Sequence, residues 1–140
     1  MIGLVSFKPG ARSDHPREAG LLILAAIRIV AWRYKQDLVI TSGDEDRGRD
    51  LNDPHPLGEA IDVSVAGIAP LVLLKIIDDL EDILGPLFTV LFEAPALASV
   101  EPMLRQAIYV NAKATGPHLH IQRKKGTIFP PPAPPAGPRV

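Results

Sequence analysis

Four polar side chains in two separate segments of the chain could bind a metal ion. His55 and Asp62 lie in DPHPLGEAID, residues 53–62, and His118 and His120 lie in HLH, residues 118–120. Catalytic zinc sites take three protein ligands from such groups and keep one position for water. His55, Asp62 and either His118 or His120 would supply that set. Zinc held in this way lowers the pKa of bound water to roughly 7, which makes hydroxide available at neutral pH.

Each of these residues also has a purely structural interpretation. His55 could be an exposed loop histidine, and HLH could be an edge strand with two exposed histidines on one face. Asp62 is harder to explain in this way, because it interrupts the apolar run AIDVSV and an unpaired buried carboxylate is costly. The joint occurrence favours a metal site, and a small α+β protein without a metal is the alternative.

The pattern of apolar residues predicts the elements that would hold these side chains. Helices are expected from about residue 16 to residue 35 and over residues 69–85. Strands are expected over residues 37–41, 59–65, 87–93 and 118–124. Residues 1–15 look irregular, and the middle of residues 95–116 suggests a short helix. This order predicts an α+β domain with a small antiparallel sheet and the helices packed on one side. The predicted buried stripe of the first helix is Leu21, Leu24, Ala25, Ile27, Val30 and Ala31.

Composition narrows the class of protein. A chain of 140 residues suits one domain, here residues 1–128, followed by a proline-rich tail, residues 129–140, that is polyproline-like or disordered. The net charge of -1 does not indicate the excess of basic residues that is typical of nucleic-acid-binding proteins. The absence of cysteine excludes disulfides and thiolate zinc sites. We see no signal peptide and no apolar run long enough to span a membrane, so we expect synthesis in the cytoplasm, with phage delivery or release to the cell wall as open routes.

The segment ITSGDEDRGRDLNDPHPLGEAIDV and the later GPHLHIQ resemble a group of zinc peptidases. This group includes D-alanyl-D-alanine carboxypeptidases, murein endopeptidases, phage peptidoglycan hydrolases and the Hedgehog signalling domain. Its first signature is a strand ending in Thr/Ser-x-Gly, then a loop, then His-x-x-Gly-x-Ala-x-Asp, and its second is a late His-x-His. The matching residues are Thr41, Ser42, Gly43, His55, Gly58, Ala60, Asp62, His118 and His120. The resemblance covers roughly residues 16–124.

The resemblance implies a Hedgehog/DD-peptidase-like fold, one zinc ion and a peptidoglycan peptide as the substrate. In this group's arrangement His55, Asp62 and His120 would be the zinc ligands. His118 would be the accessory histidine that polarises the scissile carbonyl or the developing oxyanion. The implied activity is hydrolysis of a peptide bond next to a D-amino acid, by a carboxypeptidase or an endopeptidase.

The chain departs from this group at the general base. Many members carry a glutamate a few residues before the last ligand histidine, but residues 114–117 here are Ala-Thr-Gly-Pro. Glu93, which ends the predicted strand LFTVLFE as in phage-type members, is the best substitute. If Glu93 is only a surface acid, the alternative is a metal-binding pseudoenzyme that serves as a phage or virion structural or binding module. Glu59 is a weaker candidate, because it alternates to the opposite face from Asp62.

The loop before His55 contains further charged residues. Arg47 and Arg49 could bind a terminal carboxylate of the substrate through bidentate guanidinium contacts, or could be solvated loop residues. Asp44, Glu45 and Asp46 could bind calcium, but three adjacent acids without the rest of a calcium loop favour a solvated loop.

Overall fold

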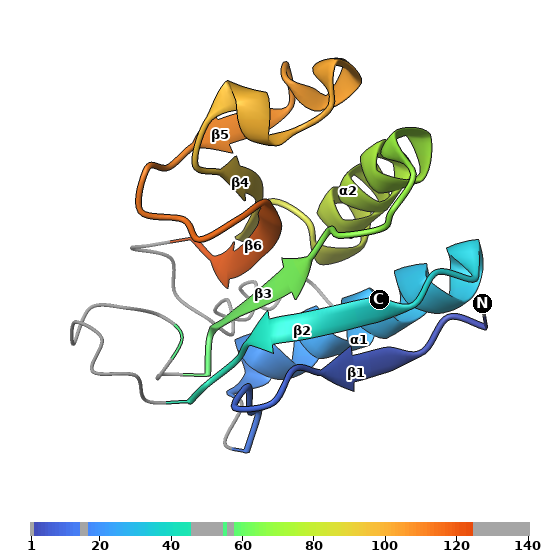
Figure 1. Cartoon of the computed structure of the whole chain (residues 1–140). Helices are drawn as coiled ribbons and strands as arrows, with labels where there is room; N and C mark the ends of the chain where they lie inside the picture. Colours follow the sequence, from blue (N-terminus) through green and yellow to red (C-terminus); the bar gives the residue numbers. More distant parts are fainter. Residues whose placement is uncertain (1, 15–16, 46–54, 56–57, 125–140) are drawn as a thin grey trace, which may run out of the picture.

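The computed structural model describes residues 2–14, 17–45, 55 and 58–124, and the predicted tail lies outside this part (Figure 1). Within these residues, two helices and six strands follow one another. The strands are β1 (Val5–Phe7), β2 (Leu38–Ser42), β3 (Ala60–Ser64), β4 (Phe88–Ala94), β5 (Ile108–Val110) and β6 (His118–Arg123). The helices are α1 (Glu18–Tyr34) and α2 (Pro70–Leu84), and two 3-10 turns, Leu97–Ser99 and Pro102–Leu104, precede β5. The two predicted helices and four predicted strands are therefore confirmed, with ends displaced by one to a few residues.

The six strands form one mixed, open sheet in the order β1-β2-β3-β6-β4-β5. The three central pairs, β2 with β3, β3 with β6 and β6 with β4, are antiparallel. At the edges, β1 pairs with β2 and β5 pairs with β4 in parallel. The predicted α+β class is confirmed, but the prediction of an antiparallel sheet is wrong at both edges. Both edge strands have three residues, which is too short for an alternating pattern to reveal them.

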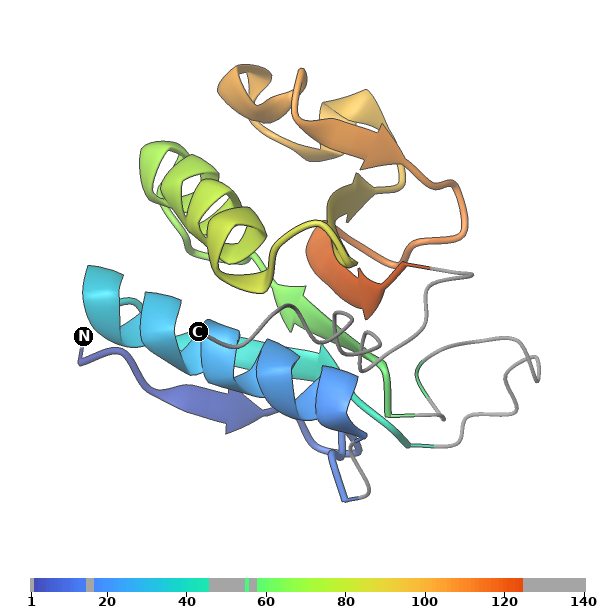
Figure 2. The same cartoon turned by 180° about the vertical axis from the view of Figure 1, so that it is seen from behind.

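Both helices cover the same face of the sheet and pack against each other (Figures 1 and 2). Their apolar side chains form one core with the inward-facing strand residues; its largest fully buried members include Ile23, Ile27, Ile40, Ile61, Leu73, Ile76, Leu80, Leu119 and Ile121. The predicted stripe of α1 is wrong at Leu21 and Ala25, which are exposed. The helix instead buries Ala19, Ile23 and Ala26, which lie one or two positions away from residues of the predicted stripe.

The alternation of β3 and β6 separates this core from a polar face. Ile61 and Val63 of β3 lie opposite Ile121 and Leu119 of β6, and all four side chains are buried in the core. The intervening residues, Asp62 and Ser64 on β3 with their partners His120 and His118 on β6, point away from the helices. The sheet therefore presents its polar side chains on the face that neither helix covers.

Gly43, which follows β2, lies against the segment before α1. A Cβ atom at this position would lie 1.8 Å from the carbonyl oxygen of Arg12, so only glycine fits without a backbone shift. The same approach allows the amide of Asp44 to donate a hydrogen bond of 2.7 Å to that oxygen. Packing thus requires the glycine of the Thr-Ser-Gly segment.

We expect Gly43→Ala to lower the free energy of unfolding by about 1–3 kcal/mol, because the added methyl group must displace backbone. Urea denaturation followed by circular dichroism would measure the change. Gly116→Ala is the matched control, since no atom lies within 4 Å of a Cβ built there. Equal stability of Gly43→Ala and the parent protein would contradict this role of Gly43.

Candidate metal centre

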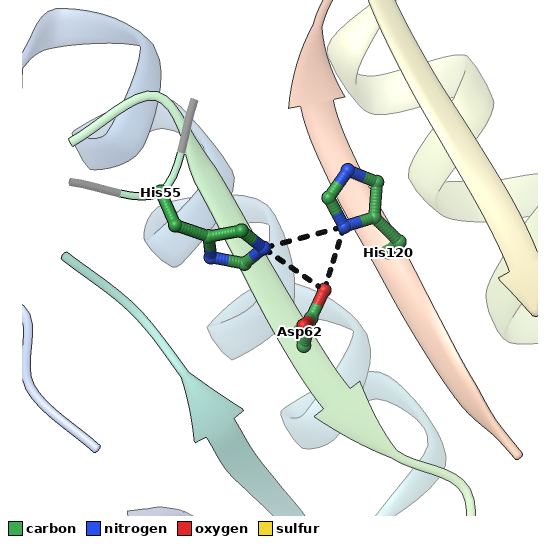
Figure 3. A group of neighbouring side chains, drawn as sticks. All are labelled: His55, Asp62 and His120. Atoms are coloured by element: carbon green, nitrogen blue, oxygen red, sulfur yellow. Dashed lines mark hydrogen bonds and ion pairs between the residues drawn. The ribbon is translucent and has the colours of Figure 1, made fainter. Parts of the chain in front are cut away.

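The side chains of His55, Asp62 and His120 converge on one point of the open face (Figure 3). Oδ1 of Asp62 lies 2.7 Å from Nδ1 of His120 and 3.3 Å from Nε2 of His55. The two histidine nitrogens are 3.4 Å apart. One ligand atom from each residue lies within 4.8 Å of the others, so the group could hold a metal ion. The structure thus brings together the three residues that the sequence analysis selected.

Two of the three side chains come from rigid strands and the third comes from a loop. Asp62 of β3 and His120 of β6 are direct cross-strand partners, so the sheet fixes their spacing. His55 lies in the connection between β2 and β3 and is only 4 % exposed. Behind it the chain turns at Gly58, whose φ of 72° favours glycine and whose amide donates to the His55 carbonyl at 2.9 Å. This turn brings the chain back into β3 with the His55 side chain over Asp62.

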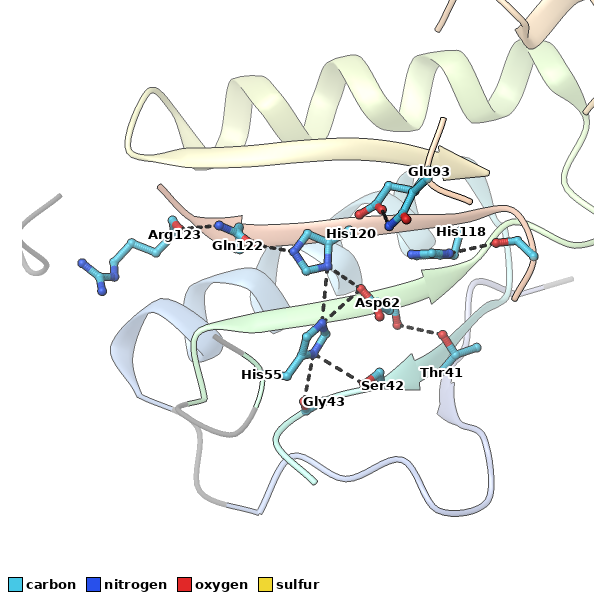
Figure 4. Close-up of polar contacts among 12 residues, drawn as sticks. Thr41, Ser42, Gly43, His55, Asp62, Glu93, His118, His120, Gln122 and Arg123 are labelled. Carbon is cyan, nitrogen blue, oxygen red and sulfur yellow. Dashed lines mark hydrogen bonds and ion pairs between the residues drawn. The ribbon is translucent and has the colours of Figure 1, made fainter. Parts of the chain in front are cut away.

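Hydrogen bonds on the outer sides of the two imidazoles determine which nitrogens face the centre (Figure 4). Nδ1 of His55 lies 3.0 Å from the carbonyl oxygen of Gly43, which can only accept, so Nδ1 carries the proton. Nε2 of His120 lies 2.6 Å from Oε1 of Gln122, which accepts in the same way. The lone pairs of His55 Nε2 and His120 Nδ1 are then available to a metal at the centre.

The pKa values of Asp62 and His120 are shifted in opposite directions. Burial opposes ionisation of Asp62, but hydrogen bonds with His120 and His55 outweigh burial and hold the pKa of its carboxyl well below the usual range. Burial likewise favours neutral His120, but the hydrogen bond with Asp62, and more weakly Gln122 and the charge of Glu93, raise the pKa of His120 above its ordinary value of 6.5. Without a metal, the Asp62–His120 pair therefore keeps a proton to a higher pH than a free imidazole does. A bound cation would take the place of that proton.

The three residues line a cleft of about 540 Å³ that also contains Glu93, His118 and Asn111. Glu93 is 8 % exposed and lies opposite His118 in the register of β4 and β6. Nδ1 of His118 donates to the carbonyl of Gly116 at 2.9 Å, so this ring is held apart from the three converging side chains (Figure 4). Both predicted catalytic residues thus line the same cleft as the candidate metal ligands.

Asn111 and Gln122 are contributors that the sequence analysis missed. Nδ2 of Asn111 donates to Oε2 of Glu93 at 2.7 Å, and its Oδ1 accepts the amide of Lys113 at 3.1 Å. The second bond sets the orientation of the Asn111 amide, and so directs its NH₂ group to Glu93. Gln122 could have been found by alternation, since it lies two residues after His120. Asn111 follows β5, which no sequence pattern revealed.

The acidic residues of the loop after β2 have structural partners. The carboxylate of Glu45 accepts hydrogen bonds from the amides of Gly43 and Arg12 and from the Ser42 hydroxyl, at 2.7, 2.9 and 2.7 Å. Asp44 accepts one from the amide of Asp14 at 3.1 Å. Through these hydrogen bonds, both acids hold in place the loop that carries the Gly43 carbonyl. Arg47, Arg49 and Asp46 lie outside the described residues.

Glu59 is engaged away from the cleft. Its buried carboxylate binds Arg123 at 2.5 Å and Arg17 at 3.3 Å. The sequence analysis placed Glu59 on the opposite side from Asp62, and these ion pairs agree with that placement. Glu59 therefore connects the end of β6 to the start of α1.

Comparisons with protein-family models, curated proteins and solved structures find no match to this chain. In the part of the chain that the structure describes, no helix has the length and apolar character needed to cross a membrane.

We expect His55→Ala and His120→Ala to abolish stoichiometric zinc binding, because each removes one of the three converging ligand atoms. Gln122→Ala should lower the affinity by about 10- to 100-fold, since such outer hydrogen bonds orient the ligand ring. Isothermal titration with zinc and elemental analysis would measure both effects. His118→Ala is the control and should bind zinc normally. Full zinc retention by both ligand variants would refute the assignment of the site.

Zinc affinity should fall as the pH falls below the raised pKa of His120. Proton and metal compete for Nδ1, so the loss is about tenfold per pH unit for one displaced proton. The metal-free protein should show the opposite trend in stability. A raised pKa in the folded state stabilises the fold at low pH, and this contribution disappears as the pH rises through that pKa.

Competition with a chelating dye, and thermal unfolding with and without zinc, would record the two pH profiles. His118→Ala should leave both unchanged. A metal-free stability that rises across the pKa of His120, in a manner abolished by His120→Ala, would contradict the retained proton.

Proposed function

We propose that this protein is a zinc-dependent peptidase that cleaves peptidoglycan peptides next to D-amino acids, with a Hedgehog/DD-peptidase-like fold. The observation that carries the proposal is the convergence of His55, Asp62 and His120 in a cleft that also holds an acid and a further histidine. The signature segments that resemble those of zinc peptidases support the same proposal, because six of their residues line this cleft: Thr41, Ser42, His55, Asp62, His118 and His120. Two imidazoles and a carboxylate are a ligand set that catalytic zinc sites use.

Bound zinc would supply Lewis acidity, activating water and polarising the substrate carbonyl. Glu93 is suited to take the proton from that water and to return it to the leaving amine. It is a buried residue of β4, and its side chain lines the same cleft as the three candidate ligands. Its charge also acts on His120, which supports its closeness to the centre. Asn111 would keep the Glu93 carboxylate in one orientation. As an imidazolium, whose Nε2 also carries a proton, His118 would donate a hydrogen bond to the carbonyl oxygen as negative charge develops there.

The cleft also contains cationic groups suited to a peptide carboxylate. Lys8, which follows β1, and Lys113, which follows β5, both line it. Their ammonium groups would attract the terminal or side-chain carboxylate of a peptidoglycan stem peptide. Arg47 and Arg49 remain the predicted substrate anchors, and the two lysines add to them from the described part of the cleft.

A metal-binding module without activity is the second candidate. It is favoured by one observation, that the loop Ala114–Pro117 lines the cleft directly before His118 but brings no acid to it. Glu93 reaches the cleft from another strand, so the two candidates differ in whether this carboxylate can replace the missing one.

We expect Glu93→Gln to retain zinc but to lower kcat for muropeptide hydrolysis by about 100-fold or more, because an amide cannot accept the proton. Asn111→Ala should cause a smaller loss, with the carboxylate present but no longer oriented. Mass spectrometry of products from stem peptides ending in D-Ala-D-Ala, and from cross-linked muropeptides, would measure turnover and identify the bond cut.

Glu101→Gln, an exposed acid outside the cleft, is the matched control and should be fully active. Unchanged turnover of Glu93→Gln would remove Glu93 from the mechanism. A zinc-loaded parent protein that cleaves neither class of substrate would favour the binding module.

A further inference from the structure

The outward face of α1 is apolar beyond the first turn, although no described element covers it. Five residues form this outer α1 face: Leu21, Leu22, Ala25, Ile29 and Trp32. At 3.6 residues per turn they fall within an arc of about 100°, which in the first turn also contains the exposed Glu18. Trp32 is 75 % exposed and Leu21 is 54 % exposed. Contiguous apolar surface of this kind marks an interaction site more often than a solvated helix face.

The neighbouring helix shows what a solvated face in this protein looks like. The exposed positions of α2 include Lys75, Asp78, Glu81 and Asp82. Both helices lie in the same layer, on the same side of the sheet (Figure 2). α2 also exposes two apolar side chains, Leu71 and Ile83, but they lie among these charged residues, so a continuous apolar stripe is found on α1 alone of the two helices.

The described part of the chain ends close to the first turn of α1. The amide of Lys124 donates to the Leu87 carbonyl at 2.8 Å, and Arg123 before it binds Glu59 at 2.5 Å. Glu59 also binds Arg17, the residue that directly precedes α1, at 3.3 Å. The chain beyond Lys124 therefore leaves from the end of α1 at which the outer α1 face begins.

The sequence beyond this point has the length and chemistry to cover that face. Residues 125–140 read KGTIFPPPAPPAGPRV and contain no acidic side chain. In the polyproline II conformation that proline favours, residues 130–138 would span roughly 28 Å. The 17 residues of α1 rise by roughly 25 Å. Proline-rich segments bind aromatic-lined apolar surfaces well, because their backbone loses little entropy on binding.

We propose that residues 130–138 dock in cis along the outer α1 face, with the proline rings against Trp32 and its apolar neighbours. Residues 125–129 would form the link from β6 to the start of α1. This contact is independent of the metal centre, which lies on the opposite face of the sheet. It assigns the proline-rich segment to this domain as a cover for α1.

Trp32 is the single tryptophan of the chain, so its fluorescence reports this contact directly. The experiment compares acrylamide quenching of the full chain with that of a chain ending at Phe129. We expect truncation to raise the quenching constant and to shift the emission to longer wavelength. A full-length variant with serine at Pro130, Pro131, Pro132, Pro134, Pro135 and Pro138 should behave like the truncated chain. Adding a synthetic peptide of residues 125–140 to the truncated chain should restore protection.

A control places the probe on the other helix, as Leu71→Trp in a Trp32→Phe background, since Leu71 is 63 % exposed on α2. Its quenching should not respond to truncation. Identical quenching of Trp32 with and without the tail would overturn the proposal. Protection that grows with protein concentration, together with a dimer mass in light scattering, would assign the face to a second copy. Protection that requires phosphatidylglycerol vesicles would assign it to a membrane surface.

Discussion

The register between β3 and β6 is the constraint on which the rest of the site depends. It sets Asp62 against His120 and Ser64 against His118, and at the same time buries the apolar residues between them. A slip of β3 by one residue would bring Asp62 into the core and an isoleucine or valine into the cleft. The apolar core below the sheet therefore enforces the geometry of the polar face above it. Folding energy and the placement of two candidate ligands come from the same pairing.

The third ligand is held by a different device. His55 lies in a loop, so strand pairing cannot position it, and backbone groups take over that task. The Gly43 carbonyl binds its Nδ1, and Glu45 in turn fixes the Gly43 segment through amide hydrogen bonds. Gly43 itself must approach Arg12 closely for this arrangement. A short chain of contacts thus connects the N-terminal segment to the orientation of one imidazole ring.

The sequence predicted those features that rest on local patterns. The long helices have clear apolar periodicity. His55 and Asp62 followed from their residue types and spacing, whereas the choice of His120 over His118 came from the resemblance to zinc peptidases. The two edge strands were not predicted, because three residues are too few to show a periodic pattern. The mixed character of the sheet, which depends on these two strands, was therefore not predicted either. Asn111 escaped for the same reason, since its role depends on where β5 places it. The exposed positions Leu21 and Ala25 were misassigned because a helix that is apolar on most sides does not indicate which side faces the core.

The short edges of the sheet also limit how another molecule can approach the cleft. β1 and β5 offer only three residues each for backbone pairing, so neither edge provides the long template that strand addition needs. The cleft instead lies over the middle of the sheet, where residues of β2, β3, β6 and β4 line it. A molecule bound there would lie across the strands and would be recognised by side chains. Its selection would therefore depend on the shape and charge of its substituents, and little on whether it has a regular peptide backbone.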